Sequence, residues 1–134
     1  MKENKKELFI VRGLVSSGKG VGRVFTSLPW FKEHVRELLK FEPYPGTLNI
    51  VLSGKNAERL AEMLDKHTHF RVPPRNGYLP GRLYRAIIAN KIRGAIIRPE
   101  ISEYPENLIE IIAPVCLRET LSIKDGDEIE ILLE

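Results

Sequence analysis

The stretch LYRAIIANKIRGAII, residues 83–97, decides the fold class of this chain. It contains two short apolar runs, residues 83–89 and 92–97, on either side of Asn90-Lys91. Short apolar runs that flank a two-residue polar turn are typical of an antiparallel β-hairpin. The sequence therefore predicts a hairpin here, with its turn at Asn90-Lys91.

Several other segments have the composition or the alternating pattern of strands. They are residues 8–15, 24–25, 47–52, 108–113 and 128–133. The last of these follows Asp125-Gly126-Asp127, a strong turn signal. Residues 73–81 (PPRNGYLPG) are expected to form a long turn-rich loop.

Two segments have the apolar periodicity of amphipathic helices. Residues 27–39 and 56–64 fit this pattern, with Ser27 and Asn56 as the expected N-caps, and a shorter helical turn is expected at residues 117–121. Six or seven short strands with two or three helices do not make an alternating βαβ pattern. We therefore expect a mainly β barrel with inserted helices.

Length and charge limit the functional classes. The chain has 134 residues, with 21 Lys and Arg against 18 Asp and Glu, so its formal charge is +3. This length predicts one barrel domain, residues 8–134, after a flexible N-terminal segment, residues 1–7. The small positive excess suits a nucleotide phosphate as well as it suits a nucleic acid.

The single cysteine, Cys116, excludes an internal disulfide and indicates a reducing compartment. It lies in the apolar run of residues 111–117 and is expected in the core. The chain has no secretion signal and no apolar run near the roughly 20 residues of a membrane helix, so we expect a cytoplasmic protein. His34, His67 and His69 do not form a zinc pattern.

The glycine-rich segment Gly18-Lys19-Gly20-Val21-Gly22-Arg23 is the first candidate site. Alternating glycines let backbone N–H groups converge on a phosphate, and Lys19 and Arg23 add positive charge. The preceding residues almost complete a P-loop pattern, but Gly20 stands where that pattern needs a hydroxyl group. The segment is therefore either a phosphate-binding loop between two strands or a flexible hairpin tip.

The segment FEPYPGTLN, residues 41–49, is the second candidate site. Two prolines and a glycine stiffen the entrance to a strand on which Thr47 and Asn49, two residues apart, share one face. That face is either simply solvated or supplies two neutral oxygen ligands to Mg²⁺. Bound Mg²⁺ usually takes further oxygen ligands from substrate phosphates.

The segment EIIAPVCLRE, residues 110–119, is the third. Glu110 interrupts an apolar strand, so it lies either on the solvent face or in a pocket. Arg118 has the forked guanidinium group that suits phosphate, and an exposed ion pair with Glu119 is the alternative.

Together these segments closely resemble the archaeal CTP-dependent riboflavin kinases, and the resemblance extends over residues 8–133. It is carried, in family order, by GKGVGR (18–23), SLPWFKEHVRELLKFEPYPGTLN (27–49), GAIIRPE (94–100), EIIAPVCLRE (110–119) and LSIKDGDEIEI (121–131). The most specific motif is Pro-Tyr-Pro-Gly-Thr-Leu-Asn. The resemblance is weakest over residues 53–85.

The resemblance implies a six-stranded cradle-loop (RIFT-type) barrel that transfers the γ-phosphate of CTP to the 5′-hydroxyl of riboflavin, giving FMN and CDP. It implies one Mg²⁺ ion on Thr47 and Asn49, and flavin contacts at Ser102 and Glu110, with Glu110 as the base or hydroxyl-orienting group. Contacts with the nucleotide are implied for Gly18, Lys19, Gly20, Val21, Gly22, Arg23, Val115, Cys116, Leu117 and Arg118. A stand-alone monomeric kinase that binds neither nucleic acid nor membrane is expected.

Two other functions fit parts of the sequence. Residues 123–129 (IKDGDEI) have a turn-and-strand pattern that also occurs in small DNA-binding swapped-hairpin barrels, and the pI is near 9.1. The first alternative is therefore a DNA-binding barrel of this kind, and the second is a flavin- or nucleotide-binding module without turnover.

Overall fold

A computed structural model describes residues 9–18, 25–75 and 77–134 of the chain. Its strands are β1 (Phe9–Ser16), β2 (Leu48–Val51), β3 (Phe70–Val72), β4 (Gly81–Ile88), β5 (Ile92–Pro99), β6 (Leu108–Ile112) and β7 (Glu128–Leu133). Its helices are α2 (Pro29–Leu39), α3 (Gly54–Lys66) and α4 (Leu117–Leu121).

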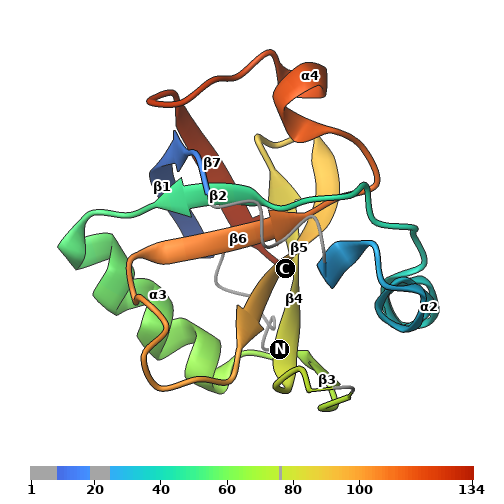
Figure 1. The fold of residues 1–134 in the computed structure, drawn as a ribbon. Helices are drawn as coiled ribbons and strands as arrows, with labels where there is room; N and C mark the ends of the chain where they lie inside the picture. The colour runs from blue at the N-terminus through green and yellow to red at the C-terminus, as the bar shows by residue number, and fades with distance from the viewer. Residues whose placement is uncertain (1–8, 19–24, 76) are drawn as a thin grey trace, which may run out of the picture.

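The strands close into a barrel. Their order is β3-β4-β5-β6-β2-β1-β7, and a further pairing of β4 with β7 joins the sheet to itself, which leaves β3 outside the closed ring (Figure 1). Each of these pairings is antiparallel. The predicted mainly β, six-stranded barrel is confirmed.

The barrel interior is built by strands whose buried and exposed residues alternate. On β1, Phe9, Val11 and Val15 are buried, whereas Arg12 between them is exposed. Gly13 belongs to the same inner row, and a Cβ atom there would lie 2.5 Å from Ile50 Cγ2. Only glycine therefore fits where β1 passes β2 this closely.

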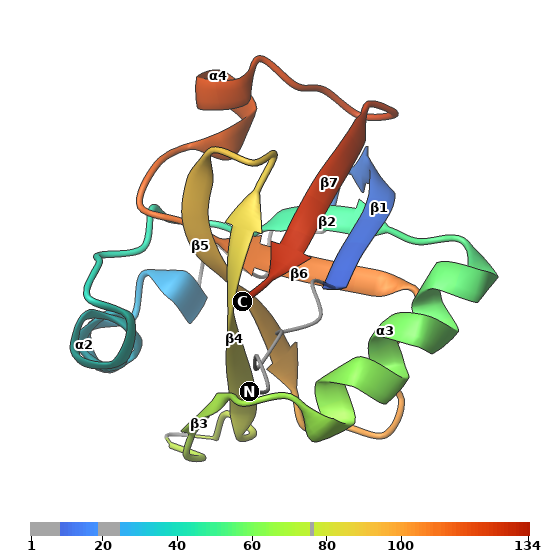
Figure 2. The same cartoon turned by 180° about the vertical axis from the view of Figure 1, so that it is seen from behind.

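Two helices flank the barrel on opposite sides, as the two views of Figures 1 and 2 agree. α3 sends Leu60 and Leu64 into the main core, whereas α2 packs Phe31 and Val35 against a second apolar cluster on the outer face of the sheet. None of the helices in the described residues is long and apolar enough to cross a membrane.

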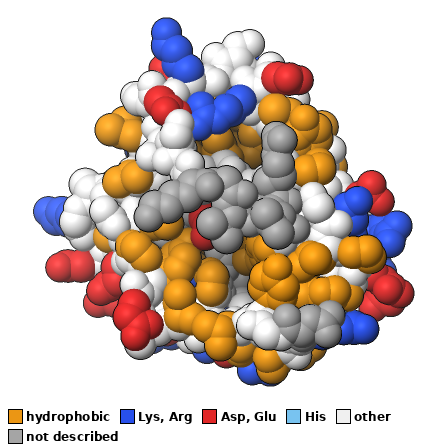
Figure 3. All heavy atoms as spheres, in the orientation of Figure 1, with side chains coloured by type: hydrophobic (Ala, Val, Ile, Leu, Met, Phe, Trp, Pro, Cys, Tyr) orange, Lys and Arg blue, Asp and Glu red, His pale blue; other side chains and the backbone are white. Residues whose placement is uncertain are grey.

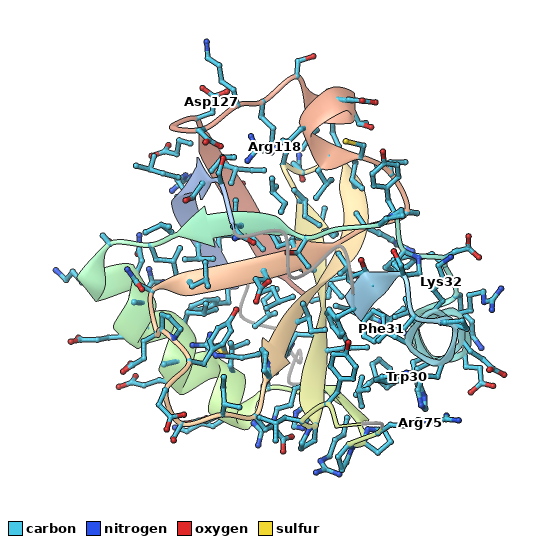
Figure 4. All side chains as sticks on the ribbon, in the orientation of Figure 1. Trp30, Phe31, Lys32, Arg75, Arg118 and Asp127 are labelled. Atoms are coloured by element: carbon cyan, nitrogen blue, oxygen red, sulfur yellow. The ribbon has the colours of Figure 1, made fainter. Side chains whose placement is uncertain are left out.

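The turn-rich segment at residues 73–81 packs against α2. The ring centroid of Tyr78 lies 5.8 Å from that of Trp30, and the Arg75 guanidinium carbon lies 6.0 Å from the Trp30 centroid (Figure 4). These contacts attach the described part of the loop to the first turn of α2.

Several predicted boundaries were wrong by a few residues. The N-caps of α2 and α3 are Leu28 and Ser53, not Ser27 and Asn56, and neither has a side-chain cap hydrogen bond. Pro29 fits the first turn of α2 because a proline lacks only an N–H that the first turn leaves unused.

The hairpin between β4 and β5 is present, but its turn is shifted by one residue. Ala89 and Asn90, with φ of 52° and 57°, are its central residues, and Lys91 N–H donates to Ile88 O at 3.0 Å. Phe25 is helical and not part of a return strand, whereas Val24 lies outside the described residues. The short strand β3 was not predicted.

Candidate functional site

A cavity of about 760 Å³ lies beside β2 and β6. Its walls come from the end of β1 and the two residues after it (16–18), the segment that enters β2 and the first residues of that strand (44–49), β6 (Leu108, Glu110 and Ile111), and the start of α4 with the two residues before it (115–119). The cavity therefore brings together described residues of all three candidate segments. On the face of the molecule shown in Figure 3, hydrophobic side chains gather over the lower half, and most charged side chains lie near the outline of the molecule.

Three side-chain oxygens meet on one wall of this cavity. Thr47 Oγ1 lies 3.2 Å from Asn49 Oδ1 and 3.1 Å from Glu110 Oε1. Asn49 and Glu110 are cross-strand partners in the β2–β6 pairing, and Thr47 precedes Asn49 by two residues on the same face. The shared face predicted for Thr47 and Asn49 is confirmed.

This oxygen cluster fits a divalent cation. The Thr47 hydroxyl has one proton, so it donates to either Asn49 Oδ1 or Glu110 Oε1 at a time. The other of these two oxygens then lies next to Thr47 Oγ1 with no hydrogen atom between them. Oxygens on one edge of an octahedron around Mg²⁺ are about 2.9 Å apart, given Mg–O distances of about 2.0–2.1 Å. The spacings here are close to that value, and the ligand types are those Mg²⁺ accepts.

The cluster differs from an acidic metal site. No group of three His, Cys, Asp or Glu side chains that could hold a metal occurs in the part of the chain that the structure describes. A cation at Thr47 and Asn49 would therefore depend on additional oxygens from water or from a substrate phosphate.

The second carboxylate oxygen of Glu110 is held from the opposite side. Tyr104 OH donates to Glu110 Oε2 at 2.6 Å. Burial of the phenol, followed by its hydrogen bond and charge interaction with Glu110, raises the pKa of Tyr104 far above its usual value. Tyr104 therefore keeps its proton and remains a donor at neutral pH.

Arg118 also lines this cavity, and it lies near the turn that contains Asp127 (Figure 4). Its guanidinium donates to Ser16 O at 3.2 Å and to Asp125 Oδ1 at 2.7 Å. Ser17 Oγ donates to the other Asp125 oxygen. The Ser17 hydrogen bond and the hydrogen bond from Arg118 hold the pKa of Asp125 below its usual value.

Gly18 is the described start of the predicted phosphate-binding loop. A Cβ atom at this position would overlap the Asn49 amide nitrogen, so the backbone passes directly against a member of the oxygen cluster. Lys19, Gly20, Val21, Gly22 and Arg23 lie outside the described residues, and their predicted contact with the nucleotide stays a prediction.

The Pro45-Gly46 turn, which leads into Thr47, is fastened from two sides. Thr26, which is fully buried, accepts a hydrogen bond from Gly46 N–H at 2.7 Å, and Tyr44 N–H donates to Ala113 O at 2.8 Å. Gly46 has a φ of 105°, which favours glycine. This arrangement fixes the start of the strand that carries the oxygen cluster.

The remaining predicted residues divide between the cavity and the exterior. Val115, Cys116 and Leu117 line the cavity at the start of α4. Cys116 is half-buried at the N-cap of α4 and not in the core, because the chain leaves the sheet at the exposed Pro114. Ser102 is exposed in the turn before Tyr104 and is not among the residues that line this cavity.

Comparison with protein families shows to which family this chain belongs. The family model CTP-dep_RFKase, whose description reads "Domain of unknown function DUF120", matches residues 15–133. The chain belongs to the CTP-dep_RFKase family. The matched residues include the described oxygen cluster, Arg118 and Tyr104.

Relatives of this CTP-dep_RFKase chain carry a functional name. It is 39% identical over 130 residues to the riboflavin kinase of Methanocella arvoryzae, covering 93% of this chain and 57% of that protein. It is 38% identical over 133 residues to the riboflavin kinase of Sulfurisphaera tokodaii, covering 95% of this chain and 96% of that protein. The chain thus spans somewhat more than half of the first relative and nearly all of the second.

Three residues that bind members of this candidate site were not singled out for these contacts in the sequence. They are Tyr104, which binds Glu110; Asp125, which binds Arg118; and Thr26, which binds Gly46. In the sequence, Asp125 was noted only as part of the predicted turn Asp125-Gly126-Asp127. A buried Thr three residues before α2, or a Tyr in a polar turn, has no local sequence pattern that indicates its partner.

Proposed function

We propose that this chain is a CTP-dependent riboflavin kinase, which transfers the γ-phosphate of CTP to the 5′-hydroxyl of riboflavin and yields FMN and CDP. The observation that carries the proposal is the oxygen cluster of Thr47, Asn49 and Glu110 in a cavity that also holds Arg118. Family membership and the names of the relatives support the same reaction.

Phosphoryl transfer needs positioning and neutralisation of charge more than it needs covalent chemistry from the protein. Thr47 and Asn49 would hold Mg²⁺ through their side-chain oxygens. When bound, the ion neutralises charge on the phosphate oxygens. Arg118 would bind a phosphate through its guanidinium group, together with Lys19, Arg23 and the backbone of residues 18–23.

Glu110 would act on the acceptor hydroxyl of riboflavin. Its Oε1 lies on the cavity side next to Thr47, while Oε2 is occupied by Tyr104. From that position Oε1 would orient the 5′-hydroxyl or accept its proton, if the two oxygens approach to about 3 Å. Ser102 would contact the flavin, and residues 115–117 would contact the nucleotide.

The choice of CTP over ATP rests on the family's name. Selection of cytosine would need hydrogen bonds to its amino and carbonyl groups, which backbone atoms of residues 115–118 lie in the right cavity to supply. We also propose that the protein works as a monomer without nucleic acid or membrane.

A single assay tests this function and its alternatives. The protein is incubated with riboflavin, Mg²⁺ and either CTP or ATP, and FMN is separated from riboflavin by chromatography with fluorescence detection. We expect FMN with CTP. Formation of FMN with ATP alone would overturn only the nucleotide preference.

The other outcomes identify the alternatives. Riboflavin binding without FMN from either nucleotide would indicate a binding module. Binding of duplex DNA that weakens steeply with salt, without nucleotide binding, would indicate a DNA-binding barrel.

A further inference from the structure

Tyr104 makes a short hydrogen bond to Glu110 from the turn between β5 and β6. Its hydroxyl lies 2.6 Å from Glu110 Oε2, within the range of about 2.5–2.7 Å for bonds between a hydroxyl and a carboxylate. Its backbone N–H donates to Ile101 O at 3.3 Å, which closes the turn between β5 and β6. The phenol therefore reaches Glu110 from a constrained position.

The ring of Tyr104 belongs to a second cavity. This cavity has a volume of about 380 Å³, and its lining includes Tyr104, Arg98, Arg82 and Tyr84, whereas Glu110 lines the main cavity. The Arg98 guanidinium carbon lies 5.3 Å from the Tyr104 ring centroid. The hydrogen bond between Tyr104 and Glu110 thus joins the walls of the two cavities.

Two contacts on different oxygens set the plane of the Glu110 carboxylate. The terminal torsion of a glutamate is broad, so a single contact leaves the carboxylate able to rotate. Tyr104 holds Oε2, and Thr47 Oγ1 lies 3.1 Å from Oε1. Without Tyr104, the contact with Thr47 alone would leave the carboxylate plane free to rotate.

We infer that Tyr104 is a positioning residue for phosphoryl transfer, whose hydroxyl holds the plane of the Glu110 carboxylate so that its other oxygen faces Thr47 and the acceptor hydroxyl. This role rests on the kinase activity proposed above. Tyr104 acts through Glu110 and makes no bond in the reaction itself.

Tyr84 provides a matched control. It lines the same second cavity, and its hydroxyl donates to a backbone carbonyl, Leu64 O, at 3.1 Å. Removal of the Tyr104 hydroxyl deletes its hydrogen bond to Glu110, and removal of the Tyr84 hydroxyl deletes its bonds with Leu64 and Arg82. Only the Tyr104 hydroxyl touches a side chain of the main cavity.

The test compares Tyr104→Phe and Tyr84→Phe with the wild type in FMN formation. Tyr104→Phe keeps the ring over Arg98, and thermal unfolding checks that both variants are folded at the assay temperature. We expect Tyr104→Phe to lower kcat about 10- to 100-fold, as for the loss of a hydrogen bond to a charged group. The KM values for riboflavin and CTP should stay within about 2-fold, and Tyr84→Phe should leave kcat within about 2-fold.

A double-mutant cycle shows whether the effect passes through Glu110. In a Glu110→Gln background, Tyr104→Phe should lower kcat by less than about 2-fold, because no carboxylate remains to be positioned. Equal kcat values for Tyr104→Phe and Tyr84→Phe, or additive effects in the cycle, would overturn the inference. A wild-type protein that forms no FMN would instead overturn the proposed function on which it rests.

Discussion

The Arg118 guanidinium donates to Asp125 Oδ1 at 2.7 Å and to Ser16 O at 3.2 Å, so one side chain ties α4 to the end of β1 and to the turn before β7. Both partners of this ion pair are partly exposed, and its contribution to stability is small. The pair also orients the guanidinium group of Arg118, which is one of the residues that line the main cavity.

Replacement of Arg118 by Gln is expected to lower kcat/KM for CTP about 10- to 100-fold, because a charge-assisted contact with phosphate is lost. Steady-state FMN formation measures this change. Arg12→Gln is the matched control, since Arg12 makes a comparable ion pair with Glu130 at 2.6 Å. A loss of similar size in Arg12→Gln would contradict a specific role for Arg118.

The carboxyl group of Asp125 should titrate below its usual value of 3.8 in the folded protein. Because its pKa is lowered on folding, its stabilising contribution is complete above 3.8 and is lost as the pH falls through the lower folded value. Carbon-13 NMR of the carboxyl group gives the midpoint. Ser17→Ala and Arg118→Gln should each raise that midpoint toward 3.8, whereas an unchanged midpoint in both would refute the assignment.

The double variant Thr47→Ala/Asn49→Ala is expected to reduce Mg²⁺-dependent turnover to about 1% or less, since both neutral ligands are lost. Turnover and Mn²⁺ binding, followed by electron paramagnetic resonance in the presence of CDP, measure the loss. Thr47→Ser keeps the hydroxyl oxygen and should retain both properties. Unaltered Mn²⁺ binding in the double variant would remove these residues as ligands.

Gly18→Ala should impair the site because the new methyl group would overlap the Asn49 amide. We expect kcat to fall at least about 10-fold, as Asn49 is pushed from its place in the oxygen cluster. Gly54→Ala is the matched control, since a Cβ atom there meets nothing within 4 Å in the first turn of α3. That variant should keep full activity and gain up to about 1 kcal/mol of stability.

Thr26→Val should destabilise the protein by about 1–3 kcal/mol, because the Gly46 N–H would lose its buried acceptor. Urea unfolding gives the change in free energy. Thr26→Ser keeps the acceptor oxygen and should lose less. If Thr26→Val matched Thr26→Ser, the hydrogen bond to Gly46 would not explain the burial of this polar side chain.

The strands were predictable where the side chains alternate or form a compact apolar run. The strand predicted at residues 128–133 has the bounds of β7, and the alternation of Leu48 and Ile50 against Asn49 placed the correct face inward. β3 was missed because three residues, one of them the exposed Arg71, are too few for a pattern. Its place depends on pairing with β4.

Turns and caps depend on backbone conformation that residue type constrains only weakly. Asn90 was expected to form the hairpin turn with Lys91, but the left-handed residues are Ala89 and Asn90, and alanine rarely adopts that conformation. Ser27 and Asn56 are good caps by residue type. The observed N-caps, Leu28 and Ser53, nevertheless lie one residue later and three residues earlier than the predicted caps.

The sequence pointed to residues that line the main cavity, but not to their contacts. Thr47, Asn49, Glu110 and Arg118 were singled out by residue type or motif and do line one cavity, and their functional roles stay predictions. The bonds from Tyr104 to Glu110 and from Asp125 to Arg118 were not, because each joins side chains whose proximity only the folded chain creates.

The closure of the ring also has a consequence for the order of folding. β7 follows every other strand in the chain, yet it pairs with both β1 and β4, and Phe9 lies opposite Leu133. Such pairing between distant parts of a chain is slow, whereas the β4–β5 hairpin is local and forms early. An intermediate without β7 would expose the edges of β1 and β4, and those edges are where aggregation during synthesis would begin.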